Sequence, residues 1–336
     1  MKTWKVLLAG MVCFFFYVFV KTTDLRLVCA SLRQVDFRFF YLLLTTFVAN
    51  WCGAVGWKYC MGRQAKGISV SYLFLIRQIG ETVGLVNPAG IVGGEACKVY
   101  LLAGRLPQAT AITASLLISR VIMAATQLIL FMVVAVLISM QGSFRLPNLP
   151  AVPAKSMVYI AACILFLIVA GRLLVTKWKP LQTSRRAASM RLKFSQSIGE
   201  VRQAFFLFFT NDKKGLVLAA IFFSMHWVLG AVEIYLILLF LHVPATMLQA
   251  MFVDLGVTFF KTAGGFIPGQ LGAEELGNRV MLGVLGPAAA SAWLTLSVLR
   301  RARQLFWILF GLAAYLIRLR SGRLSSAVHG NIVRKP

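Results

Sequence analysis

The sequence predicts an all-α, polytopic membrane protein with about six full transmembrane helices and two broken, re-entrant helical hairpins. Of its 336 residues, 59% are hydrophobic and only 13% are charged, so a soluble fold of this length would lack the polar surface to cover its core. Apolar runs long enough to cross a hydrocarbon core of about 30 Å recur from end to end. We therefore expect residues 1–336 to form a single integral membrane domain.

The predicted spans are apolar runs separated by shorter polar segments. They lie at about 5–20, 37–57, 111–139, 157–175, 215–241 and 288–316. The first run resembles the hydrophobic region of a signal peptide, but no small-residue cleavage site follows it. We therefore expect it to be retained as the first helix.

The net charge of +25 is explained by membrane topology and contact with anionic headgroups, not by nucleic-acid binding, because the basic residues cluster in short segments between apolar runs. The basic loop 176–214 and the tail 318–336 are expected on the cytoplasmic side. This places both termini in the cytoplasm and the protein in the bacterial inner membrane. The segment 21–36 fits poorly, since it carries three basic residues and yet falls outside in this scheme. The six cysteines lack CxxC or metal-ligand spacing, so no metal or cofactor is expected.

Two stretches, 68–98 and 246–279, are apolar but are interrupted by glycine, proline and charge. If each stretch enters and leaves the membrane on the same side, the number of membrane crossings agrees with the cytoplasmic placement of the basic loop and the tail. Broken backbone at membrane depth needs hydrogen-bond partners from protein or from a water-filled cavity, so the breaks should face the bundle interior. The residues expected to form the breaks or hinges are Gly84, Pro88, Gly93, Gly94, Gly264, Gly265, Pro268 and Gly272.

The two broken stretches resemble each other at a constant offset of 180 residues. A proline, a glutamate and an arginine recur at matched positions: Pro88 and Pro268, Glu95 and Glu275, Arg120 and Arg300. We predict two repeats, at about 68–139 and 248–317, with opposite orientations in the membrane. Chance matching between segments of similar apolar composition remains an alternative.

Acidic residues inside apolar segments need partners, because a charge at the bilayer centre costs about 3 kcal/mol on insertion scales. We expect the ion pairs Glu95–Arg120 and Glu275–Arg300. Such pairs could flank a polar cavity near the midplane, or they could only lock helices together. The candidate substrate-binding residues are Asn87, Glu95, Lys98, Arg120, Glu274, Glu275 and Arg300.

Two further assignments have structural alternatives. Asn87 could cap a half-helix instead of contacting a headgroup. Arg77, His226 and Glu233 form a candidate polar relay, although a hydrogen-bonded core histidine is the favoured interpretation of His226. No Ser/His/Asp or Cys/His set is visible, so we do not expect an enzyme.

Two short motifs resemble the signatures of the lysylphosphatidylglycerol synthase transmembrane-region family. The first has Asn and Pro, then Gly-Glu, a basic residue and a leucine pair, here Asn87, Pro88, Gly94, Glu95, Lys98, Leu101 and Leu102. The second has Pro, then Gly-Leu-Gly and an acid, and 267–275 is similar to it. Gln270 departs from its usually glycine-rich pattern, which leaves the local backbone geometry in question.

This resemblance covers about 6–320 and implies a flippase-like membrane protein acting on lipids or lipid-linked substrates. Some family members carry an aminoacyl-transferase domain, for which we expect no room in 336 residues. The first hypothesis is therefore a lipid translocase whose partners are membrane lipids, chiefly anionic ones. The second is an accessory protein that presents lipid to a separate lipid-modifying enzyme.

Overall fold

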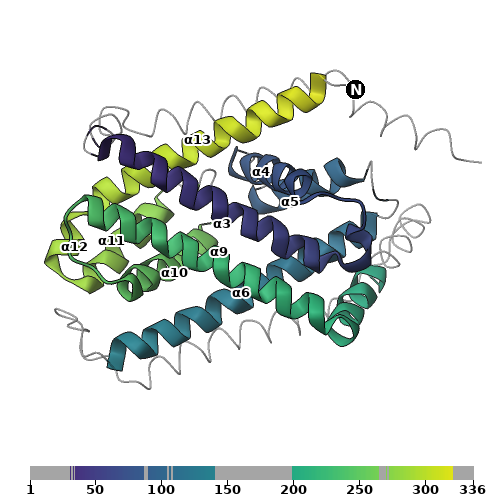
Figure 1. Ribbon diagram of the computed structural model, residues 1–336, viewed down its shortest axis with the longest axis horizontal. Helices are drawn as coiled ribbons and strands as arrows, with labels where there is room; N and C mark the ends of the chain where they lie inside the picture. The colour runs from purple at the N-terminus through teal and green to yellow at the C-terminus, as the bar shows by residue number, and fades with distance from the viewer. Residues whose placement is uncertain are drawn as a thin grey trace, which may run out of the picture. The chain divides into compact units, whose positions relative to one another are not determined.

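The protein is described from a computed structural model (Figure 1). The described residues are 31, 33, 35–86, 90–103, 106, 109–140, 199–264, 270 and 272–320. Among these residues, none lies in a β-strand, which confirms the predicted all-α class.

Three helices in the described ranges are long and apolar enough to cross a membrane. They are α3 (Phe39–Cys60), which continues the short 3-10 helix η1 (Asp36–Arg38), α6 (Ala109–Met140) and α9 (Lys213–Phe240). These helices agree with the predicted spans at 37–57, 111–139 and 215–241. Their exposed residues include large apolar side chains such as Leu44, Ile129 and Val217, as expected for contact with lipid. The predicted spans at 5–20 and 157–175 lie outside the described residues.

The last predicted span, 288–316, is divided into α12 (Pro287–Ser291) and α13 (Trp293–Arg320). The 28 residues of α13 extend about 42 Å at 1.5 Å per residue, which exceeds the hydrocarbon thickness. Its interior carries three arginines, and α13 is not among the three helices that qualify as spans by composition. The predicted basic loop 176–214 is also partly helical, because residues 199–211 form a helix.

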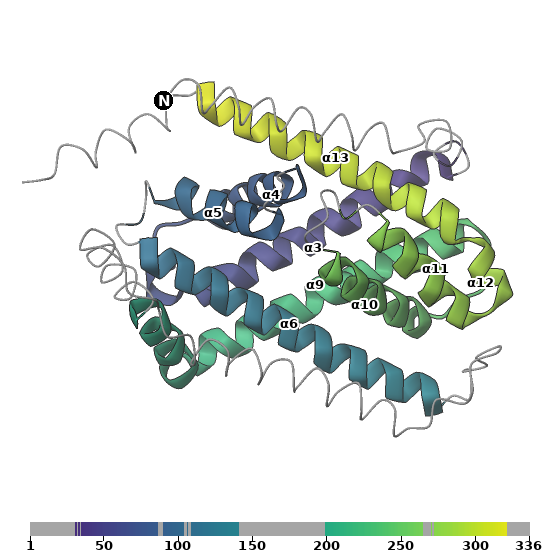
Figure 2. The ribbon, with the colours of Figure 1, turned by 180° about the vertical axis from the view of Figure 1, so that it is seen from behind.

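Helices α3 and α9 pack side by side and run in opposite directions (Figures 1 and 2). Near the start of α3, the guanidinium of Arg38 lies 5.7 Å from the ring centroid of Phe240 at the end of α9. Near the end of α3, the ring of Tyr59 stacks on that of Phe222 with centroids 5.8 Å apart. The two helices are therefore antiparallel.

Each of the two interrupted stretches forms a pair of short, contacting helices. The first pair is α4 (Val70–Val86) and α5 (Gly90–Leu102), and the second is α10 (Met247–Ala263) and α11 (Ala273–Leu285). With 17 and 13 residues, the members of each pair are about 26 Å and 20 Å long, shorter than the hydrocarbon core. Two helical hairpins are thus present at the predicted positions, while their re-entry into a membrane remains a prediction.

The same order of elements occurs twice along the described chain. A long helix, a short helical hairpin and a second long helix appear as α3, α4, α5 and α6, and then as α9, α10, α11 and α13. The starting residues of matching elements differ by amounts close to the 180-residue offset. The two hairpins lie toward opposite ends of α3 in both views (Figures 1 and 2).

Polar side chains tie the long helices to one another. The indole N–H of Trp227 on α9 donates to the carbonyl oxygen of Met123 on α6 at 3.1 Å. The indole N–H of Trp307 on α13 donates to the hydroxyl of Thr46 on α3 at 3.1 Å. Each donor gains a partner across a helix interface, which is how polar groups add specificity to packing inside a membrane.

Candidate functional site

The first cluster joins five charged side chains from α4, α5 and α6: Arg77, Glu81, Glu95, Lys98 and Arg120. On α4, Nε of Arg77 donates to Oε1 of Glu81 at 3.0 Å, as the four-residue spacing allows. On α5, Nζ of Lys98 lies 3.0 Å from Oε1 of Glu95 and 4.0 Å from Oε1 of Glu81. Lys98 therefore links the acids of the two hairpin helices.

Arg120 completes the first cluster from α6. Its Nε donates to Oε1 of Glu95 at 3.0 Å, and its Nη2 contacts the same oxygen. The predicted ion pair between Glu95 and Arg120 is thus present. The Arg120 side chain is 45% exposed, whereas that of Lys98 is 5% exposed. The cluster consequently has one accessible cation and one enclosed cation.

Glycines allow α4 and α5 to approach closely enough to bring these charges together. A Cβ at Gly94 would lie 2.5 Å from the carbonyl oxygen of Gly80, and one at Gly84 would lie 3.3 Å from that of Gly90. The glycines of each helix are four residues apart, so two side-chain-free faces meet. Of the residues predicted to have a structural or hinge role, Gly84, Gly93 and Gly94 lie inside helices and not at the break between them. Gly84 and Gly94 serve the packing of the hairpin instead.

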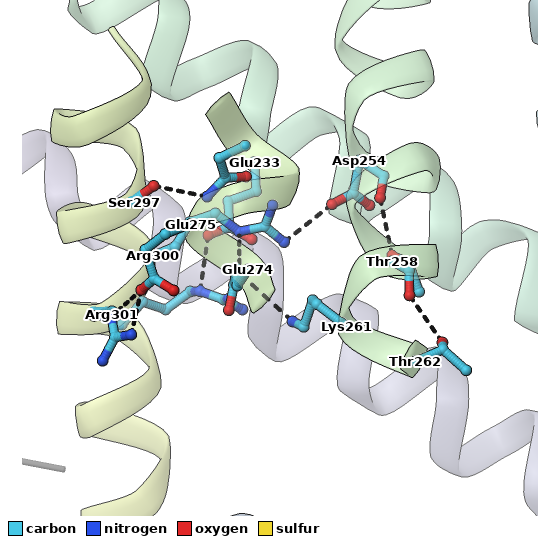
Figure 3. Close-up of polar contacts among 12 residues, drawn as sticks. Glu233, Asp254, Thr258, Lys261, Thr262, Glu274, Glu275, Ser297, Arg300 and Arg301 are labelled. Atoms are coloured by element: carbon cyan, nitrogen blue, oxygen red, sulfur yellow. Dashed lines mark hydrogen bonds and ion pairs between the residues drawn. The ribbon is translucent and has the colours of Figure 1, made fainter. Parts of the chain in front are cut away.

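The second cluster gathers eight charged side chains from α9, α10, α11 and α13: Glu233, Asp254, Lys261, Glu274, Glu275, Arg300, Arg301 and Arg303. At its centre, Nη2 of Arg300 lies 3.1 Å from Oδ1 of Asp254, and Nε lies 3.0 Å from Oε1 of Glu274. Figure 3 shows Arg300 reaching from α13 toward Asp254 on α10. Lys261 lies 3.5 Å from the same Glu274 oxygen. One buried arginine therefore bridges two acids.

The predicted ion pair between Glu275 and Arg300 is wrong. Glu275 pairs with Arg301, and its other oxygen accepts the N–H of Gly272 at 2.8 Å, at the start of α11. Successive side chains on an α-helix point about 100° apart. Glu274 and Glu275 therefore face different ways, and each meets a different one of the two adjacent arginines on α13 (Figure 3).

Two further contacts extend the second cluster. Nε of Arg303 lies 2.8 Å from Oε1 of Glu233, whose side chain is buried in α9. Beside the arginines, the amide of Asn278 on α11 donates to the hydroxyl of Ser297 on α13 at 2.9 Å. The cluster therefore connects the second hairpin to both of its neighbouring long helices.

The candidate relay residues make separate contacts. Arg77 pairs with Glu81 in the first cluster, and Glu233 pairs with Arg303 in the second. Nδ1 of His226 lies 2.7 Å from the carbonyl oxygen of Ala49, which joins α9 to α3. This contact supports the interpretation of His226 as a hydrogen-bonded core residue.

The break of the second hairpin has two unusual backbone positions in its described part. Gly272 precedes α11 with a φ of +83°, a conformation open to glycine, and Gly264 ends α10. Gln270 has a φ of +53°, in the left-handed region that costs a non-glycine residue about 1 kcal/mol or more. Asn87, Pro88, Gly265 and Pro268 lie outside the described residues.

Several cluster members were absent from the predicted binding residues: Glu81, Asp254, Lys261, Arg301 and Arg303. Asp254 and Lys261 are seven residues apart and lie on one face of α10 together with Thr258 (Figure 3). That spacing of charges within an apolar helix was the available signal. Within the described ranges, no group of three or more histidine, cysteine or acidic side chains could hold a metal ion.

The two clusters differ in net charge, while both contain buried polar atoms without a hydrogen-bond partner among the described residues. Three cations face two acids in the first cluster, which gives +1, whereas four cations face four acids in the second. In the first cluster, Oε2 of Glu95 is buried with no hydrogen-bond partner among the described residues. Only the first cluster therefore has an excess charge that an anion would balance.

Comparison with known protein families gives one match. The family described as "Lysylphosphatidylglycerol synthase TM region" matches residues 3–313. No curated protein and no solved structure matches the chain significantly.

Proposed function

Because the chain belongs to the lysylphosphatidylglycerol synthase transmembrane-region family, we propose that it is a flippase-like translocase of lipids or lipid-linked substrates. It would act in the bacterial inner membrane, with both termini in the cytoplasm, and would move its substrate without converting it chemically. The family ties the chain to lipid metabolism in a membrane. The two charged clusters support transport as the activity.

The observation that carries the proposal is the pair of charged clusters inside a bundle of apolar helices. A translocase must offer a polar headgroup an environment that replaces water while the acyl chains remain in the bilayer. Charged side chains inside a membrane are expensive, and they are kept where they bind substrates or ions or pair with one another. Arg120 and Lys98 would contact the headgroup.

An inverted repeat would provide the second requirement, access from both sides. The repeated order of helices supports this arrangement for 68–139 and 248–317. The helices that precede the two ranges, α3 and α9, pack antiparallel, as opposite orientations of the two halves require. In inverted repeats, the substrate site lies near the midplane at the interface of the two halves, beside interrupted helices. Rocking of one hairpin unit against the other would expose a midplane polar cavity to each side in turn.

The proposal is tested by reconstituting the purified protein in liposomes and measuring the transbilayer movement of a fluorescent phospholipid. Wild-type protein should accelerate movement over protein-free liposomes, and Arg120→Gln should remove most of that acceleration. The matched control is Arg279→Gln, an exposed arginine on α11 that lies 5.9 Å from the ring centroid of Trp293. Wild-type protein that moves no lipid in this assay would contradict the translocase function.

The alternative is an accessory protein that presents lipid to a separate lipid-modifying enzyme. The balanced charge of the second cluster favours it, because fully paired acids and bases can serve to lock helices together. In that case, the purified protein would bind lipid without moving it. A lipid-modifying enzyme would then copurify with the protein from its native membrane.

A further inference from the structure

We propose that the first cluster is a binding site for a single monoanionic phosphodiester, the group that links a phospholipid headgroup to its glycerol. The second cluster would then be a permanent brace that binds no ligand. This inference rests on the proposed function for its lipid substrate, and it assigns the two halves of the protein different tasks.

The geometry around Glu95 shows where an anion would bind. Nζ of Lys98 and Nε of Arg120 both lie 3.0 Å from Oε1 of Glu95, so one anionic oxygen already sits between the two cations. A phosphate oxygen can occupy the same position and accept the same hydrogen bonds. Glu95 is held through this single oxygen, because its Oε2 has no hydrogen-bond partner within the described part of the chain. A ligand oxygen can therefore take the place of Oε1 between the two cations, while the ionised carboxylate turns aside and remains in the cluster.

The two clusters differ in how exposed their arginine side chains are. The side chain of Arg120 is 45% exposed, whereas those of Arg300, Arg301 and Arg303 are 5%, 13% and 16% exposed. A lipid headgroup can therefore reach Arg120 without disturbing the helix packing. Reaching the arginines of α13 would require separating α9, α10 and α11 from α13.

Charge defines the class of ligand. The first cluster carries +1, so a phosphodiester with one negative charge makes it neutral. A phosphomonoester or inorganic phosphate carries about −1.5 to −2 at pH 7 and would leave an uncompensated negative charge in a low-dielectric site. Phosphatidylglycerol should therefore bind better than phosphatidic acid. Phosphatidylcholine should bind less well than phosphatidylglycerol, because its own ammonium group competes for the phosphate.

The test measures lipid binding to the delipidated full-length protein by native mass spectrometry, with the three phospholipids named above as probes. Wild-type protein should bind one phosphatidylglycerol in preference to the other two. Arg120→Gln should weaken that binding roughly tenfold or more, because it removes hydrogen bonds from a charged donor. Arg279→Gln should bind as wild type does. Inorganic phosphate, added as a soluble competitor, should not displace the lipid.

Glu95→Gln gives the sharpest result, because it removes the competing carboxylate and should strengthen phosphatidylglycerol binding. A merely structural Glu95 would leave binding unchanged or weaken it. Glu275→Gln, at the matching position of the second half, should create no additional lipid site. Weaker binding in Glu95→Gln, or displacement of the lipid by inorganic phosphate, would overturn the inference. A protein that shows the predicted binding but moves no lipid in liposomes would contradict the translocase function and leave this inference standing.

Discussion

Replacing Arg300 with methionine should strongly destabilise the fold, because Arg300 holds two buried acids. Methionine keeps most of the side-chain volume and removes the charge. Glu274 keeps Lys261 at 3.5 Å, but Asp254 loses the only ion pair identified for it among the described residues. The expected effect is therefore that of one buried carboxylate left without its cation.

The size of the effect follows from the two choices open to that carboxylate. Leaving a buried charge unpaired costs about 3–5 kcal/mol. Taking up a proton instead costs about 4 kcal/mol at pH 7, since an ordinary aspartic acid has a pKa of about 3.9 and each unit is 1.36 kcal/mol. We expect Arg300→Met to lower the free energy of unfolding by about 3–4 kcal/mol at pH 7. At pH 5 the loss should shrink to about 1.5 kcal/mol, because protonation is cheaper there.

The assay is equilibrium unfolding in mixed micelles at pH 7 and pH 5, with wild-type protein measured at each pH. Adding Asp254→Asn to Arg300→Met should recover much of the loss, because the double variant no longer carries the stranded charge. Arg279→Met, on an exposed arginine, is the matched control and should lose no more than about 1 kcal/mol, the contribution of its exposed contact with the Trp293 ring. A loss below about 1 kcal/mol at pH 7, or an equal loss at both pH values, would refute this reasoning.

Three other substitutions test the packing that positions the clusters, each by the same unfolding measurement. Gly94→Ala should destabilise by about 1–3 kcal/mol, because its Cβ would lie 2.5 Å from a carbonyl oxygen of α4, whereas Gly283→Ala, with no heavy atom within 4 Å, should not. Thr246→Ala should cost about 1 kcal/mol, since Thr246 caps α10 in a reciprocal capping box, and no change would show that the cap is dispensable. His226→Leu should cost about 0.5–1.5 kcal/mol by removing the hydrogen bond to the Ala49 carbonyl oxygen of α3, and a neutral result would disprove a structural role for that contact.

The all-α class, the three long apolar helices and the two helical hairpins could be predicted because they depend on apolar length and on helix-breaking residues. The ion pair of Glu95 with Arg120 could also be predicted, since each residue lacks a like-charged neighbour in the chain. The pairing of Glu275 could not, because an acid precedes it and two adjacent arginines compete for it. Choosing between them requires the rotation of α11 against α13, which tertiary packing sets.

The repeat helped to find the site and also concealed part of it. A comparison at a 180-residue offset highlights only positions that are the same in both halves. Asp254 corresponds to Phe74, and Arg301 corresponds to Val121, so neither could emerge from that comparison. These differing positions give the second cluster one of its two additional acids and its additional arginine. The proposed contrast between the two halves thus depends on positions that differ between the two stretches.

The central residue is an acid in the first cluster and an arginine in the second, so the two clusters respond in opposite ways when that residue is lost. Glu95 is an acidic hub that separates two cations, whereas Arg300 is a basic hub that separates two acids. Removing the first hub leaves a receptor for negative charge, and removing the second leaves a receptor for positive charge. A single substitution therefore makes the interior attract anions more strongly or makes it attract cations, depending on which half of the protein receives it.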